Sequence, residues 1–107
     1  MFIVTELCTE GDLFDYVKRK GFLEETEAAS ILRQLTEAIL YLNNEMGIIH
    51  RDLKPENIMV KLCEDKSRVH KVKIIDFGFG VYKDQLTDLP LDEKFAGTPG
   101  FIAPEVF

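Results

Sequence analysis

Apolar side chains recur at steps of three and four residues between residues 25 and 45, which is the period of one face of an α-helix. Gly47 follows closely, and glycine commonly ends a helix. A helix of this kind buries its apolar face, so the pattern predicts the longest element of a folded domain. The residues of that face are Ala28, Ile31, Leu32, Leu35, Ala38, Ile39 and Leu42.

Shorter apolar segments precede this helix. Residues 2–4 (FIV) predict a short buried strand that leads into a turn at residues 8–11. Asp12 is a suitable N-cap for a second helix, and Gly21 is suitable to end it. The apolar face of that helix is expected to carry Leu13, Tyr16 and Val17.

Three apolar segments follow the long helix, at residues 48–49, 58–60 and 72–75. The last two are separated by the mixed-charge residues 61–71, which predicts a β-hairpin with a polar connection. Residues 76–105 keep no period and are interrupted by glycine and proline, so we expect a long irregular segment there. Two helices and short strands place the chain in the α+β class.

Composition excludes some classes of function. The chain is 46% apolar and 30% charged, as in soluble globular proteins, and its net charge of −6 argues against nucleic-acid binding. No apolar stretch approaches the ~20 residues of a membrane helix, and no basic leader is present, so we expect no membrane partner. We expect a cytoplasmic protein, with a nucleocytoplasmic one as the alternative, in which Cys8 and Cys63 are reduced thiols.

Residues 50–57 (HRDLKPEN) and the DFG triplet that begins at Asp76 carry the polar groups that phosphoryl transfer requires. That reaction needs a base that orients a hydroxyl, cations near the phosphate oxygens and ligands for Mg²⁺. Asp52 offers a carboxylate acceptor, and Lys54 offers an ammonium close to it. Asn57 and Asp76 offer the hard oxygen ligands that Mg²⁺ prefers.

The chain resembles the eukaryotic protein kinases through three motifs in family order, which are HRDLKPEN, DFG and GTPGFIAPE at residues 97–105. Lys54 and the GTP triplet are similar to the serine/threonine branch, and Gly100 with Phe101 is most similar to the calcium/calmodulin-dependent group. The resemblance implies a kinase-like α+β fragment, mainly the helical C-terminal lobe, with short β-hairpins and an activation segment.

The resemblance covers residues 1–107 as a partial protein kinase domain. It implies a hinge strand and linker at residues 1–11 and two helices at residues 12–47. A catalytic loop and hairpin would occupy residues 48–75, and the activation segment would occupy residues 76–105.

The resemblance also implies catalytic roles, with ATP and Mg²⁺ as cofactors. Asp52 would be the catalytic base, Lys54 would contact the γ-phosphate, and Thr98 would hydrogen-bond toward both. Asn57 and Asp76 would bind Mg²⁺.

Five residues would surround the nucleotide by the same resemblance. Thr5 would guard the back of the pocket, and the backbones of Glu6 and Cys8 would contact adenine. Met59 would form the pocket floor, and Asp12 would face the ribose.

The expected partners are ATP and a protein substrate with a serine or threonine hydroxyl; calmodulin binding is not inferable from these residues. Asp12 and Glu56 are either solvated carboxylates or, as in similar kinases, groups that draw basic residues upstream of the target hydroxyl. His50 is expected to be structural and to pack against Phe77, as the resemblance implies.

Arg51 stands where the family pairs an arginine with a phosphate on the activation loop. Few hydroxyls lie in the corresponding segment here, so we hypothesise that Asp92 or Glu93 supplies a permanent negative charge. Thr87 is the alternative phosphorylation site.

Residues 1–107 contain neither a glycine-rich loop nor a Val-Ala-Ile-Lys lysine, so we expect the chain taken alone to bind nucleotide weakly and to be inactive. The intact Asp52, Lys54, Asn57 and Asp76 favour a kinase segment. Two alternatives stay open: a truncated kinase-like fragment with a binding or regulatory role, and an incomplete reading of a longer gene.

Overall fold

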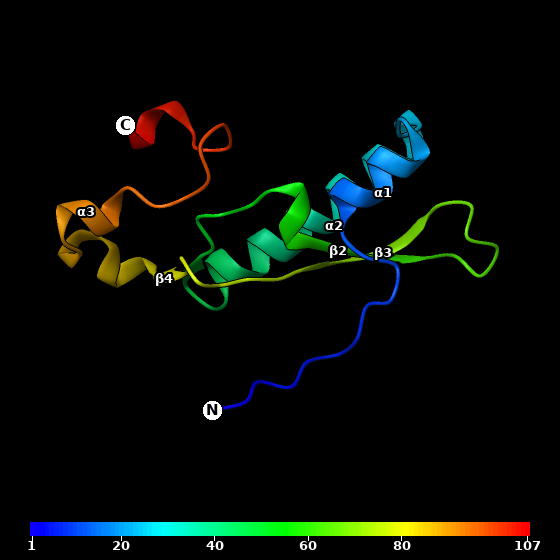
Figure 1. Ribbon diagram of the computed structural model, residues 1–107. Coiled ribbons are helices and arrows are strands. Elements are labelled where there is room, and N and C mark those ends of the chain that lie inside the picture. The colour runs from blue at the N-terminus through cyan, green and yellow to red at the C-terminus, as the bar shows by residue number, and fades with distance from the viewer.

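The computed structural model describes all 107 residues (Figure 1). The elements in chain order are α1 (Leu13–Lys20), α2 (Glu25–Asn44), β1 (Ile48–Ile49), β2 (Ile58–Leu62), β3 (Val69–Ile74), β4 (Val81–Tyr82) and α3 (Leu91–Lys94), with 3₁₀ turns at Pro55–Asn57, Lys83–Asp88 and Pro104–Val106. Helices combined with short antiparallel strands confirm the predicted α+β class. None of the helices combines the length and the apolar character needed to cross a bilayer.

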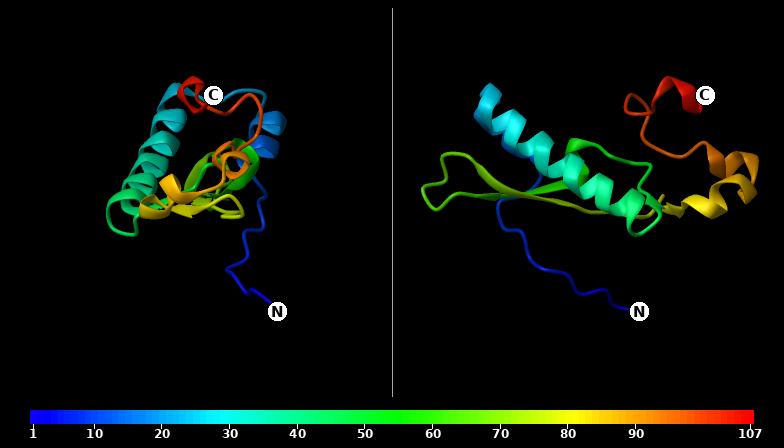
Figure 2. Two further views of the ribbon diagram at one scale, coloured as in Figure 1. Left: turned by 90° about the vertical axis from the view of Figure 1, so that its left-hand side faces the viewer. Right: turned by 180° about the vertical axis from the view of Figure 1, so that it is seen from behind.

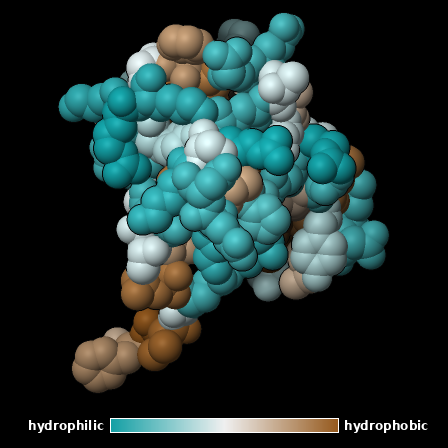
Figure 3. Space-filling model, turned by 90° about the vertical axis from the view of Figure 1, so that its right-hand side faces the viewer, coloured by the Kyte–Doolittle hydropathy of each residue, from teal (hydrophilic) through white to brown (hydrophobic).

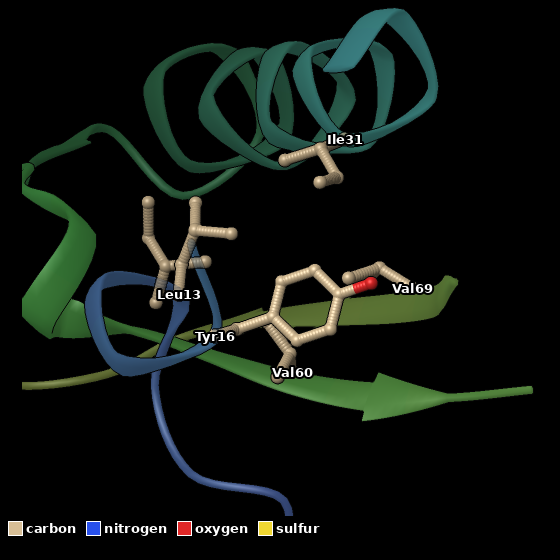
Figure 4. Close-up of a cluster of buried hydrophobic side chains, with 6 residues drawn as sticks. Leu13, Tyr16, Ile31, Val60 and Val69 are labelled. Carbon is tan, nitrogen blue, oxygen red and sulfur yellow. The ribbon is translucent and has the colours of Figure 1, made fainter. Parts of the chain in front are cut away.

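The core lies between the hairpin β2–β3 and the two helices. The strands pair antiparallel, with Ile58 opposite Ile74 and Val60 opposite Val72, which confirms the predicted hairpin. Side chains at alternate positions of a strand point to the same face, so this register directs one apolar row toward the helices. Figure 4 shows side chains from α1, α2 and both strands pointing toward one another. The buried cluster consists of Leu13, Tyr16, Ile31, Ile58, Val60 and Val69.

Helix α1 begins and ends where its sequence predicts. The Asp12 carboxylate accepts a hydrogen bond from the backbone N–H of Asp15 at 2.8 Å, as an N-cap does. Gly21 has a φ of 91°, which side chains disfavour, and its N–H donates to the carbonyl of Val17. These two ends fix the helix directly after the linker.

A buried carboxylate joins α1, α2 and β3. Glu27 of α2 is 6% exposed and accepts hydrogen bonds from the Tyr16 hydroxyl at 2.6 Å, the Lys20 ammonium at 2.5 Å and the Val69 N–H at 2.8 Å. Burial raises the pKa of the Glu27 carboxyl, whereas the three hydrogen bonds lower it, and the bond from Lys20 has the largest lowering effect. Together the hydrogen bonds outweigh burial, so the pKa lies below 4.5. Glu27 therefore stays ionised and paired at neutral pH.

The apolar face of α2 divides between two neighbours. Ile31 and Leu35 pack on the hairpin cluster, whereas Ile39 and Leu42 line a pocket of about 540 Å³ near the C-terminal residues. Leu32 is 62% exposed, so the prediction that it lies on the buried face was wrong. Successive helical residues are about 100° apart, and burying Ile31 turns its neighbour toward solvent.

Residues 2–4 do not form the predicted strand. Phe2 is 98% exposed and Val4 is 93% exposed, and this segment runs away from the body of the molecule in all three ribbon views (Figures 1 and 2). Figure 3 shows the same region as an apolar projection below a largely hydrophilic face. A strand requires hydrogen bonds to a neighbouring strand, and none of the four strands pairs with these residues.

Residues 76–105 contain more order than predicted. β4 pairs antiparallel with β1, and a 3₁₀ turn and the single turn of α3 follow it. Elements of two to six residues are too short to show a helical or strand period, which is why the sequence pattern did not indicate them. These elements lie at the opposite end of the molecule from the hairpin turn (Figure 1).

Candidate active site

Two adjoining segments carry the predicted catalytic and metal-binding residues. The loop from β1 to β2 carries Asp52, Lys54 and Asn57, and Asp76 follows the end of β3. The backbone N–H of Ile75 donates to the carbonyl of Asn57 at 2.9 Å, which holds the two segments side by side. The hairpin therefore places the catalytic loop next to the DFG triplet.

Asp52 lies at the centre of a polar cluster. Its Oδ1 accepts a hydrogen bond from the Thr98 hydroxyl at 2.5 Å, and its Oδ2 lies 3.0 Å from Asn57 Nδ2 and 3.2 Å from Lys54 Nζ. The Lys54 ammonium also donates to Thr98 Oγ1 at 2.6 Å. The structure thus brings together all four residues predicted to act in catalysis.

The environment keeps the Asp52 carboxylate ionised. The Thr98 hydroxyl is the largest cause that lowers the pKa of Asp52, burial acts in the opposite direction, and the hydrogen bond from Lys54 lowers the pKa further. A carboxylate of low pKa is a weak base, so it stays charged and can still accept a hydrogen bond, but it takes up a proton poorly. Asp52 is therefore better suited to orient a hydroxyl than to deprotonate it in advance.

Asn57 and Asp76 present oxygen atoms of the kind that Mg²⁺ prefers. Asn57 Nδ2 donates to the carbonyl and the carboxylate of Asp52, which leaves its amide oxygen as the atom available to a cation. Asp76 is exposed, and its Oδ1 accepts from the Gly78 N–H at 3.1 Å. No group of three or more His, Cys, Asp or Glu side chains could hold a metal by itself. One amide and one carboxylate oxygen suit a Mg²⁺ ion that completes its shell with water and phosphate.

Two residues of the site have strained backbones. Arg51 has a φ of 67° and Asp76 a φ of 59°, in the left-handed region that costs a non-glycine residue about 1–3 kcal/mol. Gly97, with a φ of 131°, approaches this loop so closely that a Cβ atom would lie 2.9 Å from the Arg51 carbonyl oxygen. Only glycine fits there, and this close approach delivers Thr98 to Asp52.

His50 occupies the structural position that the kinase resemblance implies. Its ring lies 4.8 Å from that of Phe77 in an edge-to-face arrangement and is 4% exposed. Nε2 lies 2.9 Å from the Ile75 carbonyl oxygen, and Nδ1 accepts from the Asp52 N–H at 3.2 Å. One tautomer, protonated at Nε2, satisfies both contacts, so the ring supports the catalytic loop.

Arg51 does not pair with the carboxylates that the sequence suggested. Its Nε donates to the Phe79 carbonyl and its Nη1 to the Glu93 carbonyl, both at 2.7 Å. Neither Asp92 nor Glu93 forms an ion pair with it, so their proposed role as a permanent phosphate substitute finds no support in the geometry. The guanidinium is instead held by main-chain oxygens.

If the full-length protein transfers phosphate, as its motifs predict, we expect the double variant Asp92→Asn/Glu93→Gln to do so within about twofold of the wild-type rate, since exposed carboxylates without partners contribute little. The Arg51→Ala variant serves as the comparison, because it removes the hydrogen bonds to the carbonyl oxygens of Phe79 and Glu93. Steady-state rates on one peptide substrate decide the point. A loss in the double variant as large as that in Arg51→Ala would restore the charge hypothesis.

The residues predicted to surround the nucleotide are only partly gathered. Asp12 forms an isolated β-bridge with Met59, so these two lie together, although the Asp12 carboxylate caps α1 instead of being free for a ribose. Cys8 is half-buried. Thr5 is exposed in the extended N-terminal segment and makes no hydrogen bond to the rest of the molecule.

The Glu6 side chain has partners that sequence reasoning missed. Its carboxylate bonds to Lys61 on β2 and to Lys73 on β3. Side chains of a strand alternate between its two faces, so the predicted hairpin already places Lys61 on the same face as Met59. A lysine on that face was a signal that could have indicated a charged partner nearby.

Comparison with known proteins bears on the family to which this chain belongs. A family model for the protein kinase domain matches residues 1–107. The chain is 40% identical over 107 residues to the calcium/calmodulin-dependent protein kinase cmkB of Emericella nidulans, covering 100% of this chain and 25% of that protein.

Two further relatives are also kinases. The chain is 42% identical over 106 residues to the phosphorylase b kinase gamma catalytic chain, liver/testis isoform, of Bos taurus, covering 99% of this chain and 24% of that protein. It is 38% identical over 106 residues to the calcium/calmodulin-dependent protein kinase type 1 of Macrobrachium nipponense, covering 99% of this chain and 28% of that protein. The chain spans about a quarter of the length of these curated relatives. With a family model that covers every residue, the chain belongs to the protein kinase family.

Proposed function

We propose that the full-length protein transfers the γ-phosphate of ATP to a serine or threonine hydroxyl of a protein substrate. The observation that carries this proposal is the cluster in which Thr98, Lys54 and Asn57 all contact the Asp52 carboxylate. Phosphoryl transfer requires positioned charge more than covalent chemistry, and this cluster is an arrangement of that kind.

Asp52 would accept a hydrogen bond from the substrate hydroxyl and take its proton as the new P–O bond forms. Lys54, 3.2 Å from the same carboxylate, is close enough to neutralise negative charge on the phosphoryl group in transfer. Thr98 bonds to both residues and so fixes the distance between acceptor and cation. As the bond to the substrate oxygen forms, the bond between the γ-phosphorus and the bridging oxygen of ATP breaks, and ADP leaves with that electron pair. The proton ends on Asp52 Oδ, and the phosphate ends on the substrate oxygen.

The Mg²⁺ complex of ATP, when bound, supplies the phosphoryl group and offsets its charge. Asn57 and Asp76 would hold the ion, since an amide and a carboxylate oxygen on adjoining segments match its preference for hard ligands. Met59, with the backbone of Glu6 and Cys8, would contact the adenine.

We further propose that substrates carry basic residues upstream of the target hydroxyl. Glu56 is exposed in the turn Pro55–Asn57, directly beside the catalytic cluster, and the chain as a whole carries a net charge of −6. Exposed carboxylates next to the site of transfer attract cationic peptides and disfavour acidic ones.

A phosphate-transfer assay with the full-length protein tests the proposal. Peptides that differ only in serine, threonine or tyrosine at the target position, each with arginine or glycine upstream, should show transfer to serine and threonine and faster transfer with arginine. Phosphoamino-acid analysis identifies the acceptor. If no peptide or generic protein substrate is phosphorylated while the protein is folded, the binding or regulatory alternative replaces this proposal.

A further inference from the structure

The linker that precedes α1 is fastened to the hairpin by one side chain. Lys61 Nζ lies 3.0 Å from Glu6 Oε2, and Lys73 Nζ lies 2.6 Å from Glu6 Oε1. Each lysine thus takes one oxygen of the same carboxylate. The hydrogen bonds from Lys73 and Lys61 hold the pKa of the Glu6 carboxyl at about 2, so it remains charged at any physiological pH.

The residues that hold Glu6 share a face with the predicted adenine floor. Met59 lies directly opposite Lys73 in the register of β2 and β3, so their side chains point to the same side of the hairpin. Lys61 is two residues beyond Met59 on the same strand and therefore points to that side as well. The other face carries Val60 and the buried core.

The remainder of the linker has few other attachments. The Val60 N–H donates to the Gly11 carbonyl at 3.0 Å, which ties the C-terminal end of the linker to β2. Residues 1–8 make no backbone hydrogen bond to the rest of the chain, and the Glu6 carboxylate supplies their only side-chain hydrogen bonds and ion pairs. Without it, the linker would be held only at its C-terminal end, where Val60 N–H donates to the Gly11 carbonyl and Arg19 Nη2 donates to the Glu10 carbonyl at 3.1 Å.

Glu6 also offsets repulsion within the hairpin. Lys61 is paired directly with Lys71 across the two strands, an arrangement of like charges that destabilises a sheet, and Lys73 lies further along the same face. Glu6 is the only acidic side chain that pairs with any of these lysines. Its removal would free the linker and also leave two ammonium groups without a counter-charge.

We propose that Glu6 is a positioning residue, whose carboxylate holds the linker over the Met59 face of the hairpin and thereby sets the affinity for the nucleotide. This inference rests on the proposed kinase function. Glu6 would act on ATP through the backbone it immobilises, because its side chain is already occupied by Lys61 and Lys73.

The test compares the full-length wild type with Glu6→Gln. We expect Glu6→Gln to raise the KM for ATP about threefold to tenfold, the effect of losing two exposed ion pairs, with kcat and the peptide KM unchanged. The increase should shrink at high salt, because such pairs are screened. Glu64→Gln is the matched control, since it removes the same charge from an exposed position without ion pairs and should leave the KM for ATP unchanged.

A charge-reversed variant separates positioning from a general loss of stability. Glu6→Lys together with Lys61→Glu and Lys73→Glu rebuilds the contacts with opposite signs, so it should restore most of the ATP affinity. An unchanged KM for ATP in Glu6→Gln, or a change in kcat in place of KM, would overturn the inference.

NMR relaxation provides a readout that does not depend on activity. Because the backbone amides of residues 6–8 make no hydrogen bond, their mobility depends on the Glu6 side chain, and their order parameters should be lower in Glu6→Gln than in Glu64→Gln. Equal order parameters in the two variants would overturn the inference even if the enzyme were active. A wild type that transfers no phosphate, by contrast, refutes the proposed function, while the order parameters still decide whether Glu6 holds the linker.

Discussion

Replacement of Asp52 by asparagine is expected to lower kcat by about 10²–10⁴-fold, the range typical of removing a general base. Asparagine has nearly the same shape, so the side chain still fits between Thr98 and Asn57, but it carries no charge and cannot take the proton of a substrate hydroxyl. The ion pair with Lys54, 3.2 Å long in the wild type, is lost as well. The measurement is kcat at saturating ATP and peptide, with thermal unfolding recorded alongside.

Asp15→Asn is the matched control for this variant. Asp15 is an exposed carboxylate of α1 whose side chain makes no hydrogen bond or ion pair, so its loss should leave kcat unchanged. Both variants should unfold within a few degrees of the wild type. Substantial turnover in Asp52→Asn would refute the assignment of Asp52 as the base. A large fall in the unfolding temperature of this variant would instead assign Asp52 a structural role.

Replacement of Glu27 by alanine is expected to destabilise the domain by about 3 kcal/mol, the cost of removing one member of a buried charged network. The change leaves the Tyr16 hydroxyl, the Lys20 ammonium and the Val69 N–H without their shared acceptor. Urea unfolding of the wild type and the variant measures the difference. Glu37→Ala is the control, because that glutamate lies on the same helix with its side chain 65% exposed and should cost less than about 1 kcal/mol.

The same carboxylate makes stability depend on pH. Because the folded-state pKa of Glu27 lies below its ordinary value of 4.5, its contribution is fully present above pH 4.5 and is lost as the pH falls through the folded-state pKa. Glu27→Gln should therefore unfold with a weaker dependence on pH below 4.5 than the wild type. Identical acid unfolding curves for the two proteins would contradict the network as a source of acid sensitivity.

The local motifs predicted the site better than they predicted the packing around it. The spacing of Asp52, Lys54 and Asn57 places them in one short loop, and a loop of eight residues leaves little freedom for them to separate. Thr98 could be added only through the resemblance to a family, since its contact with Asp52 spans 46 residues of chain.

Long-range contacts account for what sequence patterns could not indicate. Glutamate is usually exposed, so the residue type alone predicts that Glu27 lies on the surface. Its burial is favourable because α1 and β3, packed against α2, supply its hydrogen-bond donors. The pairing of β1 with β4 joins two segments of two residues each, which carry too little pattern to be detected. The Glu6 contacts likewise depend on a hairpin register that composition does not specify.

The period of the apolar residues correctly predicted the helix α2, but it did not correctly predict which side chains of that helix are buried. The 20 residues of the helix meet the hairpin at one end and the C-terminal residues at the other, so different side chains are covered along its length. Leu32 falls between these contacts. Apolar spacing defines an average face, whereas packing partners decide the burial of each residue.

The guanidinium of Arg51 donates hydrogen bonds to two main-chain carbonyl oxygens, and a residue of any type carries such an oxygen. Substitution at position 79 or 93 would consequently leave both hydrogen bonds intact as long as the backbone keeps the same conformation. The side chains at these two positions can therefore change without loss of the two Arg51 hydrogen bonds. A proline near either position, by altering the path itself, would release the segment where a change of charge would not.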